Sequence, residues 1–276
     1  MSAIVHDLSD SALLAANHAN LVELYHFLGQ VPPGEAHDGP EVSWAITGVP
    51  DAEFNTVTRA RFAPGVDASD VDAAIARTLA RFSARQVPVT WFVGPDAQPA
   101  DLGTRLERHG LMYAGARPAM GADLLAPRAE PVAPDGLTIT EAVDPEAVGL
   151  WARTAVRGFG MPGAIEDPVA ALYMRLPAGP DSPARYHVAC LDARPVATSS
   201  LFLGAGVAGI YAVATLPEAR RQGIGAATVL ASMRTAQALG FHVAILQASP
   251  MGYPVYQELG FRENGKLHTY TGNTAG

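Results

Sequence analysis

The sequence is poor in cysteine, in lysine and in charge of either sign. Cys190 is the only cysteine among 276 residues, which excludes an intrachain disulfide and a zinc site built from several cysteines. It lies in an apolar, strand-like run, 187–191, which favours a small core residue over a nucleophile. Lys266 is the only lysine, and charged residues make up 17% of the chain. Because 49% of the residues are hydrophobic, the low charge does not indicate disorder.

Two further kinds of segment are missing from the sequence. No apolar run reaches the roughly 18 residues that a transmembrane helix needs, and residues 1–10 lack the basic region of a signal peptide. The net charge of −8 argues against a general nucleic-acid binder, because neutralising phosphates requires clustered Lys and Arg. We therefore expect a cytoplasmic protein that binds neither a nucleic acid nor a membrane. The sequence leaves a homodimer open.

A proline-rich stretch divides the chain into two parts of similar length. Residues 126–136 read APRAEPVAPDG, with three prolines and no hydrophobic periodicity, which predicts a semi-rigid linker. The predicted domains are therefore residues 1–125 and 137–276. The runs LERHGLMY and YQELGFRE occupy matching places near the ends of the two parts. This weak internal repeat indicates an ancient duplication.

Both parts alternate helical and strand-like patterns, which predicts a mixed α/β fold. In the first part we expect a helix on the leucines 13–28, a loop at 32–40, strands at 42–47, 54–62, 87–93 and 111–124, and helices at 100–109 and after an N-terminal cap at Ser69. In the second part we expect strands at 137–143, 185–191, 197–203, 209–215, 242–248 and from 261, and helices at 145–159, 166–175, 225–239 and 252–259.

The stretch 209–229, GIYAVATLPEARRQGIGAATV, carries the most chemical information. A strand-like run is followed by two arginines, the glycines Gly223 and Gly225, and a long helix. Glycines permit close approach of a ligand, and the first turn of a helix exposes unpaired N–H groups and a partial positive charge. Phosphates bind at such places, and Arg220 and Arg221 add charge. The stretch is therefore a candidate diphosphate cradle; the alternative is an ordinary strand-to-helix turn.

Two better-known phosphate motifs do not fit this stretch. A P-loop requires a lysine after its last glycine, and none is present here. A dinucleotide-binding fingerprint requires a third glycine, but the residues after Gly225 are Ala226, Ala227 and Thr228.

The residues instead resemble the GNAT superfamily of N-acyltransferases. Its signature at a strand-to-helix turn is Gln or Arg, two residues, Gly, one residue, then Gly or Ala; Arg220-x-x-Gly223-x-Gly225 matches it, with Pro217 upstream. GNAT enzymes often carry a tyrosine four residues before a Gly-Phe pair, as Tyr256 stands before Gly260-Phe261. The resemblance covers about residues 137–272. In the first part the corresponding turn, 61–67, lacks the glycine pair, which indicates a degenerate GNAT-like domain in tandem with an intact one.

The resemblance implies an N-acetyltransferase that uses acetyl-CoA as co-substrate, needs no metal, and acetylates an amine of a small molecule or peptide. Backbone amides of 221–226 would hold the diphosphate, the strand edge 212–214 would pair with the pantetheine amides, and Tyr256 would protonate the departing thiolate. Ser249 would contact the cofactor or Tyr256, unless it only caps a helix. The implied cofactor-binding residues are Ala212, Val213, Ala214, Arg220, Arg221, Gln222, Gly223, Ile224, Gly225, Ala226 and Ser249.

The sequence departs from the family at the general base. Many GNAT enzymes carry a carboxylate on the strand before the cradle, but residues 209–215 contain no acid. The candidates that remain are Glu166, Asp167, His187 or a water held by the backbone. The residues that could line an acceptor pocket are Phe159, Met161, Tyr173 and Tyr211, all equally compatible with the core.

Three alternatives stay open. A non-catalytic CoA-binding sensor is compatible with the missing carboxylate. A GNAT-fold transferase with another acyl donor is a second alternative, although the acidic pI of about 5.4 disfavours aminoacyl-tRNA. In the third, the glycine turn is purely structural.

Overall fold

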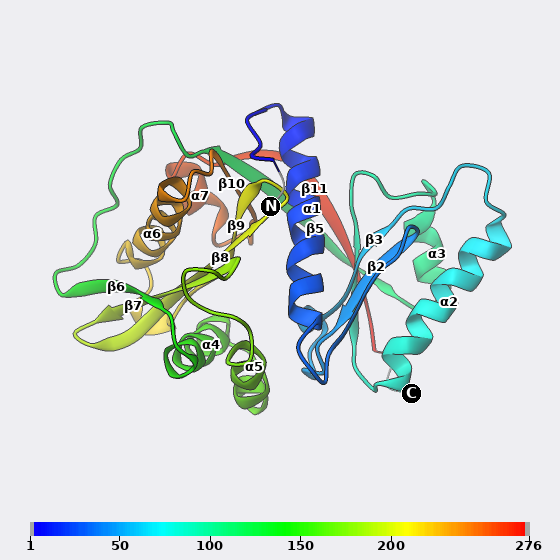
Figure 1. The fold of residues 1–276 in the computed structure, drawn as a ribbon, viewed down its shortest axis with the longest axis horizontal. Helices are drawn as coiled ribbons and strands as arrows, with labels where there is room; N and C mark the ends of the chain where they lie inside the picture. The colour runs from blue at the N-terminus through cyan, green and yellow to red at the C-terminus, as the bar shows by residue number, and fades with distance from the viewer. Residues whose placement is uncertain (1–2, 274–276) are drawn as a thin grey trace. The chain divides into compact units, whose positions relative to one another are not determined.

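The computed structural model describes residues 3–273 and divides the chain into two compact units (Figure 1). Unit 1 comprises Met1–Asn20 and Ala119–Gly265, and unit 2 comprises Leu21–Pro118 and Lys266–Gly276. Helix α1 (Asp10–Gly29) and strands β5 (Met112–Asp123) and β11 (Arg262–Gly272) each contribute residues to both units. Each unit therefore combines segments from both sides of the predicted linker. The domain boundary at 126–136 stays a prediction.

In unit 1, neighbouring strands of a mixed sheet follow the order β6-β7-β8-β9-β10-β5. Its bounds are β6 Leu137–Ala142, β7 Ala184–Leu191, β8 Arg194–Gly204, β9 Val207–Thr215 and β10 Val243–Gln247. Only the β9–β10 pair is parallel; β5 pairs with β10 through Ala119–Asp123 in antiparallel register. This is the mixed α/β architecture that the element order predicts.

Helices cover both faces of the unit 1 sheet. Figure 1 shows α6 (Ile224–Ala238) and α7 (Tyr253–Glu258) on one side, and α4 (Pro145–Phe159) and α5 (Glu166–Tyr173) on the other. Val229 and Met233 of α6 pack against Leu201 and Ile210 of the sheet, all at most 2% exposed. On the α4 side, the indole of Trp151 donates to the Ser199 carbonyl at 3.0 Å. This layering places β9 between two helical layers.

Unit 2 contains strands β1 (Glu35–Asp38), β2 (Val42–Ile46), β3 (Asn55–Ala60) and β4 (Val89–Val93), in that order, with the end of β11 beside β4. Its core lies against α2 (Ala68–Ala84) and α3 (Leu102–Arg108). Two local predictions are wrong here. The expected loop at 32–40 contains β1, and α2 begins before Ser69, with Asp67 as its N-cap residue.

Two asparagines of α1, Asn17 and Asn20, form hydrogen bonds with the backbone of the unit 1 sheet. The Asn20 amide donates to the carbonyls of Gly204 (2.8 Å), Phe202 (3.2 Å) and Val207 (3.4 Å), and its Oδ1 accepts from the Tyr211 hydroxyl at 2.7 Å. Asn17 likewise donates to the Leu246 carbonyl, at 2.9 Å. The leucine spacing predicts the helix but not this role, because the bonds join residues more than 180 positions apart.

Replacing Asn20 by alanine is expected to lower the free energy of unfolding by about 3 kcal/mol, because a fully buried amide that serves four partners is lost. Urea unfolding monitored by circular dichroism measures this. Ser11→Ala on the exposed side of α1 is the control, expected within about 0.5 kcal/mol of wild type. Equal unfolding midpoints for the two variants would contradict the anchoring role.

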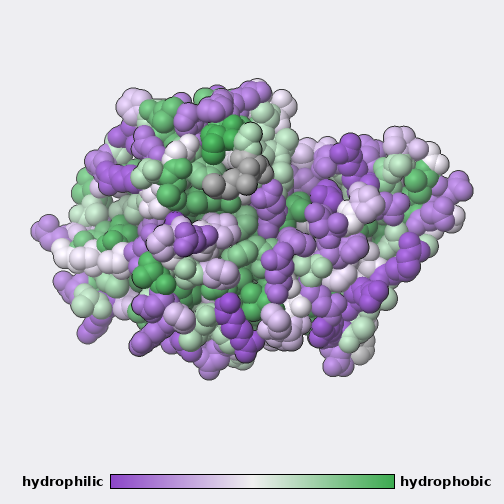
Figure 2. Space-filling model, viewed as in Figure 1, coloured by the Kyte–Doolittle hydropathy of each residue, from purple (hydrophilic) through white to green (hydrophobic). Residues whose placement is uncertain are grey.

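The surface mixes hydrophilic and apolar residues on the face drawn in Figure 2. Within the described residues, no helix combines the length and the apolarity needed to cross a membrane.

Candidate acyl-CoA site

A bulge and a loss of pairing distinguish the second half of β9. Ser200 and Thr198 of β8 pair with Tyr211 and Ala214, so that one residue of β8 faces two of β9. On its other side, β9 pairs with β10 only through Ala208 and Gly209. Beyond Gly209 the two parallel strands share no register pairs. The edge of residues 212–214 is therefore available to another extended chain.

The bulge places Ala212 in a strained conformation. Its φ of 47° lies in the left-handed region, which costs a non-glycine residue about 1 kcal/mol or more. The Thr198 hydroxyl donates to the Ala212 carbonyl at 2.9 Å and fixes its direction. Thr198 is fully buried and was not singled out from the sequence; the run of three hydroxyl residues Thr198, Ser199 and Ser200 in an otherwise apolar strand is the signal that could have found it.

The predicted cradle follows directly after β9. A short 3-10 turn at Pro217–Ala219 leads to Arg221 and Gly223, whose φ values of 61° and 76° are both left-handed. Gly223 is the N-cap of α6, and the Ala227 N–H donates to the Gly223 carbonyl at 3.0 Å. Residues 224–226 form the first turn, whose N–H groups have no acceptor inside the helix. The loop and the helix N-terminus predicted from the sequence thus occur as one structural feature.

The two arginines of the motif have different surroundings. The Arg220 guanidinium donates to the carbonyls of Thr215 (3.0 Å) and Gly158 (2.9 Å), so it ties the end of β9 to the end of α4. Arg221 and Gln222 are exposed beside the first turn of α6. Arg220 therefore shapes the loop, while Arg221 presents its charge to solvent next to the amides.

Tyr256 lies on α7 and is 7% exposed, in the core cluster that contains Leu246 of β10 and Ala248 just after that strand. Burial raises the pKa of its phenol to about 12, so the hydroxyl stays protonated at neutral pH. A Cβ at Gly252 would lie 2.7 Å from the Tyr256 ring, so glycine there makes room for the phenol. Such a group can donate a proton and cannot serve as a base.

Ser249 occupies the turn before α7 and is exposed. Its hydroxyl accepts from the Gly252 N–H at 3.1 Å, and its carbonyl accepts from the Tyr253 N–H at 2.9 Å. Ser249 therefore caps the start of α7, which is one of the two roles that the sequence left open for it. Contact with a cofactor remains a prediction.

None of the three candidate bases lies free beside the bulge. Glu166 forms an ion pair with Arg157, whose guanidinium lowers the pKa of that carboxyl. Asp167 pairs with Arg153 and is 86% exposed. His187 lies on β7, separated from β9 by β8. A carboxylate held in its charged form by a neighbouring arginine accepts protons poorly at neutral pH.

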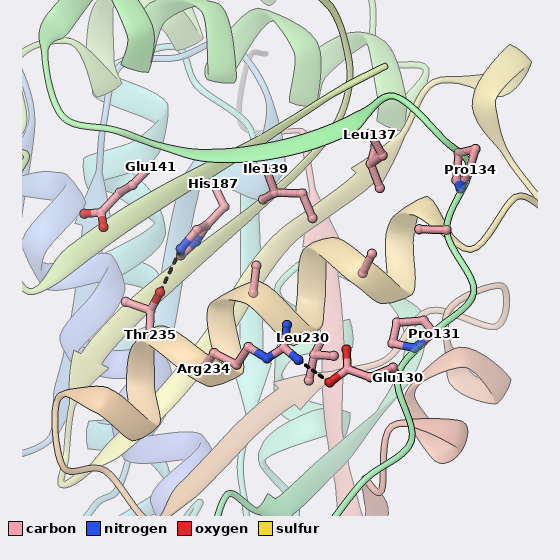
Figure 3. A pocket seen from close by; sticks show the side chains of 13 residues that line it. Glu130, Pro131, Pro134, Leu137, Ile139, Glu141, His187, Leu230, Arg234 and Thr235 are labelled. Carbon is pink, nitrogen blue, oxygen red and sulfur yellow. Dashed lines mark hydrogen bonds and ion pairs between the residues drawn. The ribbon is translucent and has the colours of Figure 1, made fainter. Parts of the chain in front are cut away.

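His187 and Thr235 line a surface pocket (Figure 3), and His187 also belongs to a network of buried hydroxyl groups. Its Nδ1 is 3.0 Å from the Ser232 hydroxyl and its Nε2 is 3.1 Å from the Thr235 hydroxyl, while Ser232 also bonds Ser199 at 2.7 Å. Burial lowers the pKa of the imidazole. The arrangement supports a neutral histidine that joins β7 to α6.

The aromatic residues suggested for an acceptor pocket are not gathered into one cluster. Tyr173 packs against Trp151 with ring centroids 4.8 Å apart, Tyr211 bonds Asn20, and Phe159 is 54% exposed at the end of α4. Met161 follows α4 and is half-buried. Cys190 is half-buried on β7 and not in the core as predicted; burial still raises the pKa of its thiol, which disfavours a reactive thiolate. In the described part of the chain, no three His, Cys, Asp or Glu side chains gather as metal ligands.

Comparisons with known proteins agree with this geometry. Residues 159–261 match the model of the acetyltransferase (GNAT) family. The match contains β9, the cradle, α6 and Tyr256, and it supports acyl transfer as the general chemistry. No curated protein matches the sequence.

Solved structures resemble nearly the whole chain. A GCN5-related N-acetyltransferase from Kribbella flavida aligns with a TM-score of 0.67 and 19% identity, over 93% of this chain and 95% of that one. A tandem GNAT protein from the clavulanic acid biosynthesis pathway aligns with a TM-score of 0.60 and 16% identity, over 99% of this chain and 97% of that one. A GCN5-related N-acetyltransferase from Sphaerobacter thermophilus aligns with a TM-score of 0.62 and 14% identity, over 100% of this chain and 95% of that one. The predicted tandem GNAT fold is confirmed.

Proposed function

We propose that the protein is an N-acetyltransferase that moves an acetyl group from acetyl-CoA to an amine of a small-molecule or peptide acceptor. The observation that carries the proposal is the continuity of the bulged, unpaired β9 edge with the glycine-capped N-terminus of α6. The edge suits a chain of amides, and the helix N-terminus suits a diphosphate. Pantetheine and diphosphate follow one another in CoA in the same order.

Each part of the site has a separate role in this proposal. The N–H groups of 221–226 bind the diphosphate, with Arg221 adding charge, and the edge of 212–214 pairs with the pantetheine amides. The amine nitrogen attacks the thioester carbonyl, the C–S bond breaks, and the Tyr256 hydroxyl protonates the departing sulfur. The attacking nitrogen loses its proton to water, because the three candidate side-chain bases are engaged elsewhere. The Tyr256 phenolate then regains a proton from water, which completes the cycle.

The same observation about the bases favours one alternative, a CoA-binding sensor without turnover. Such a sensor would bind CoA in the same cradle but would not transfer an acyl group. Transfer of another acyl group is a variant of the first proposal that the cradle equally allows, because the diphosphate is common to all acyl-CoA molecules.

Calorimetric titration of acetyl-CoA into the purified protein tests the proposal, with a micromolar dissociation constant expected. A screen of amine acceptors that measures release of free CoA thiol then separates enzyme from sensor. Absence of acetyl-CoA binding would overturn the proposal. Binding without thiol release for any amine, alongside tight binding of CoA itself, would favour the sensor.

A further inference from the structure

The linker of residues 126–136, here called the strap, contacts the cradle directly. A Cβ added to Gly223 would overlap the Val132 carbonyl oxygen and lie 3.0 Å from the carbonyl carbon. Only glycine leaves room for the strap at this position. The contact joins a segment predicted to be a mere connection to the N-cap of α6.

The Val132 carbonyl and a diphosphate would both be attracted to the N-terminus of α6. A carbonyl oxygen carries partial negative charge and lies at the positive end of α6. The oxygens of a diphosphate are attracted to the same end of the helix. Two groups of negative charge cannot share this space without repulsion, so the strap and the diphosphate are competitors.

The strap is fastened at its ends and weakly held in its middle. At the start, the Arg128 guanidinium donates to the carbonyls of Asp123 (2.5 Å) and Leu124 (3.3 Å). At the end, the Asp192 N–H donates to the Gly136 carbonyl at 3.4 Å. Between these points, an ion pair links Glu130 to Arg234, with side chains 67% and 58% exposed. An exposed pair of this kind contributes at most about 1 kcal/mol.

Packing adds little to the middle of the strap. The Val132 side chain is 90% exposed, and each proline removes a backbone donor. A pocket of about 580 Å³ lies among the strap, α6 and β6 (Figure 3). Its lining includes Pro131 and Pro134 of the strap, Leu230 of α6 and Ile139 of β6. The middle of the strap can therefore move away from α6 without opening the hydrophobic core.

We propose that the strap is an autoinhibitory cover, which competes with the diphosphate of acyl-CoA for the cradle and is lifted when acyl-CoA binds. The proposal rests on the proposed function of the cradle. It follows that the fraction of molecules with a lifted strap sets the apparent affinity for acyl-CoA.

A cross-link that holds the strap down tests this. Glu130→Cys and Arg234→Cys replace the ion pair in a Cys190→Ser background, and a short bis-maleimide joins the two thiols. We expect acetyl-CoA to bind the bridged protein at least about tenfold more weakly than the same protein capped with N-ethylmaleimide. The capped protein is the matched control, because it carries the same substitutions and the same thioether chemistry.

The outcomes separate the strap from the cradle. Equal affinity in the bridged and capped proteins, or tighter binding in the bridged one, would overturn the cover. Absence of binding in wild type as well would refute the cradle itself. Trypsin provides a second readout on the unmodified protein, since Arg128 is the only cleavage site in the strap. Acetyl-CoA is expected to accelerate cleavage after Arg128, and protection instead would overturn the cover.

Discussion

Gly225→Asp is expected to raise the dissociation constant for acetyl-CoA at least about 100-fold, a loss of roughly 2.7 kcal/mol of binding free energy. Gly225 is the second residue of α6, so the new carboxylate would lie among the amides proposed to hold the diphosphate. It would accept their hydrogen bonds and repel a second anion. An acidic residue in the first turn also favours the helix, so the fold is expected to keep its stability.

Gly225→Ala is the matched control for this substitution. A Cβ at this position would lie 3.2 Å from the Thr215 hydroxyl, and both variants introduce that contact. Only the aspartate introduces charge. Calorimetry on the two variants therefore isolates the electrostatic term, and we expect the alanine variant to stay within about fivefold of wild type. If the aspartate variant bound as well as the alanine variant, the diphosphate would not lie at this helix terminus.

The elements that the sequence predicts best are those with signals close together in the chain. Helix α4 begins at Pro145 and ends at Phe159, as expected. The Asp144 side chain accepts from the Ala147 N–H at 2.9 Å, and Gly160 ends the helix with a φ of 67°. All of these signals lie within one turn of an end of α4, so no tertiary contact is needed to interpret them.

Features that depend on distant residues were not predictable in this way. Strand β1 lies between prolines and exists because Glu35–Asp38 pair with β2. The role of Asn20 depends on carbonyls about 180 residues away, and the contact of Val132 with Gly223 depends on how the chain returns over α6. The cradle itself was predictable, because its glycines, arginines and helix are contiguous. The contact between the strap and the cradle was not predictable, because the sequence of the strap does not show which residues lie next to it in the fold.

The substitution Tyr256→Phe is expected to reduce kcat about 100-fold and to leave the dissociation constant of acetyl-CoA within about twofold of wild type. Phenylalanine fills the same buried space, so the packing against β10 is kept and only the proton donor is lost. Because burial raises the pKa of the Tyr256 phenol to about 12, the group stays protonated through pH 10. An alkaline decrease in rate below that pH would therefore belong to another group.

The matched control is Tyr253→Phe on the same helix, whose exposed hydroxyl donates to Glu263 at 3.0 Å. It is expected to keep kcat within about twofold of wild type. A thioester of an aromatic thiol gives a second test, because its thiolate leaves without a proton, so the ratio of wild-type to Tyr256→Phe rates should fall toward one. An unchanged ratio would mean that Tyr256 acts through packing. Full activity of Tyr256→Phe with acetyl-CoA would assign protonation of the sulfur to another group, most simply to water at the unpaired edge of β9.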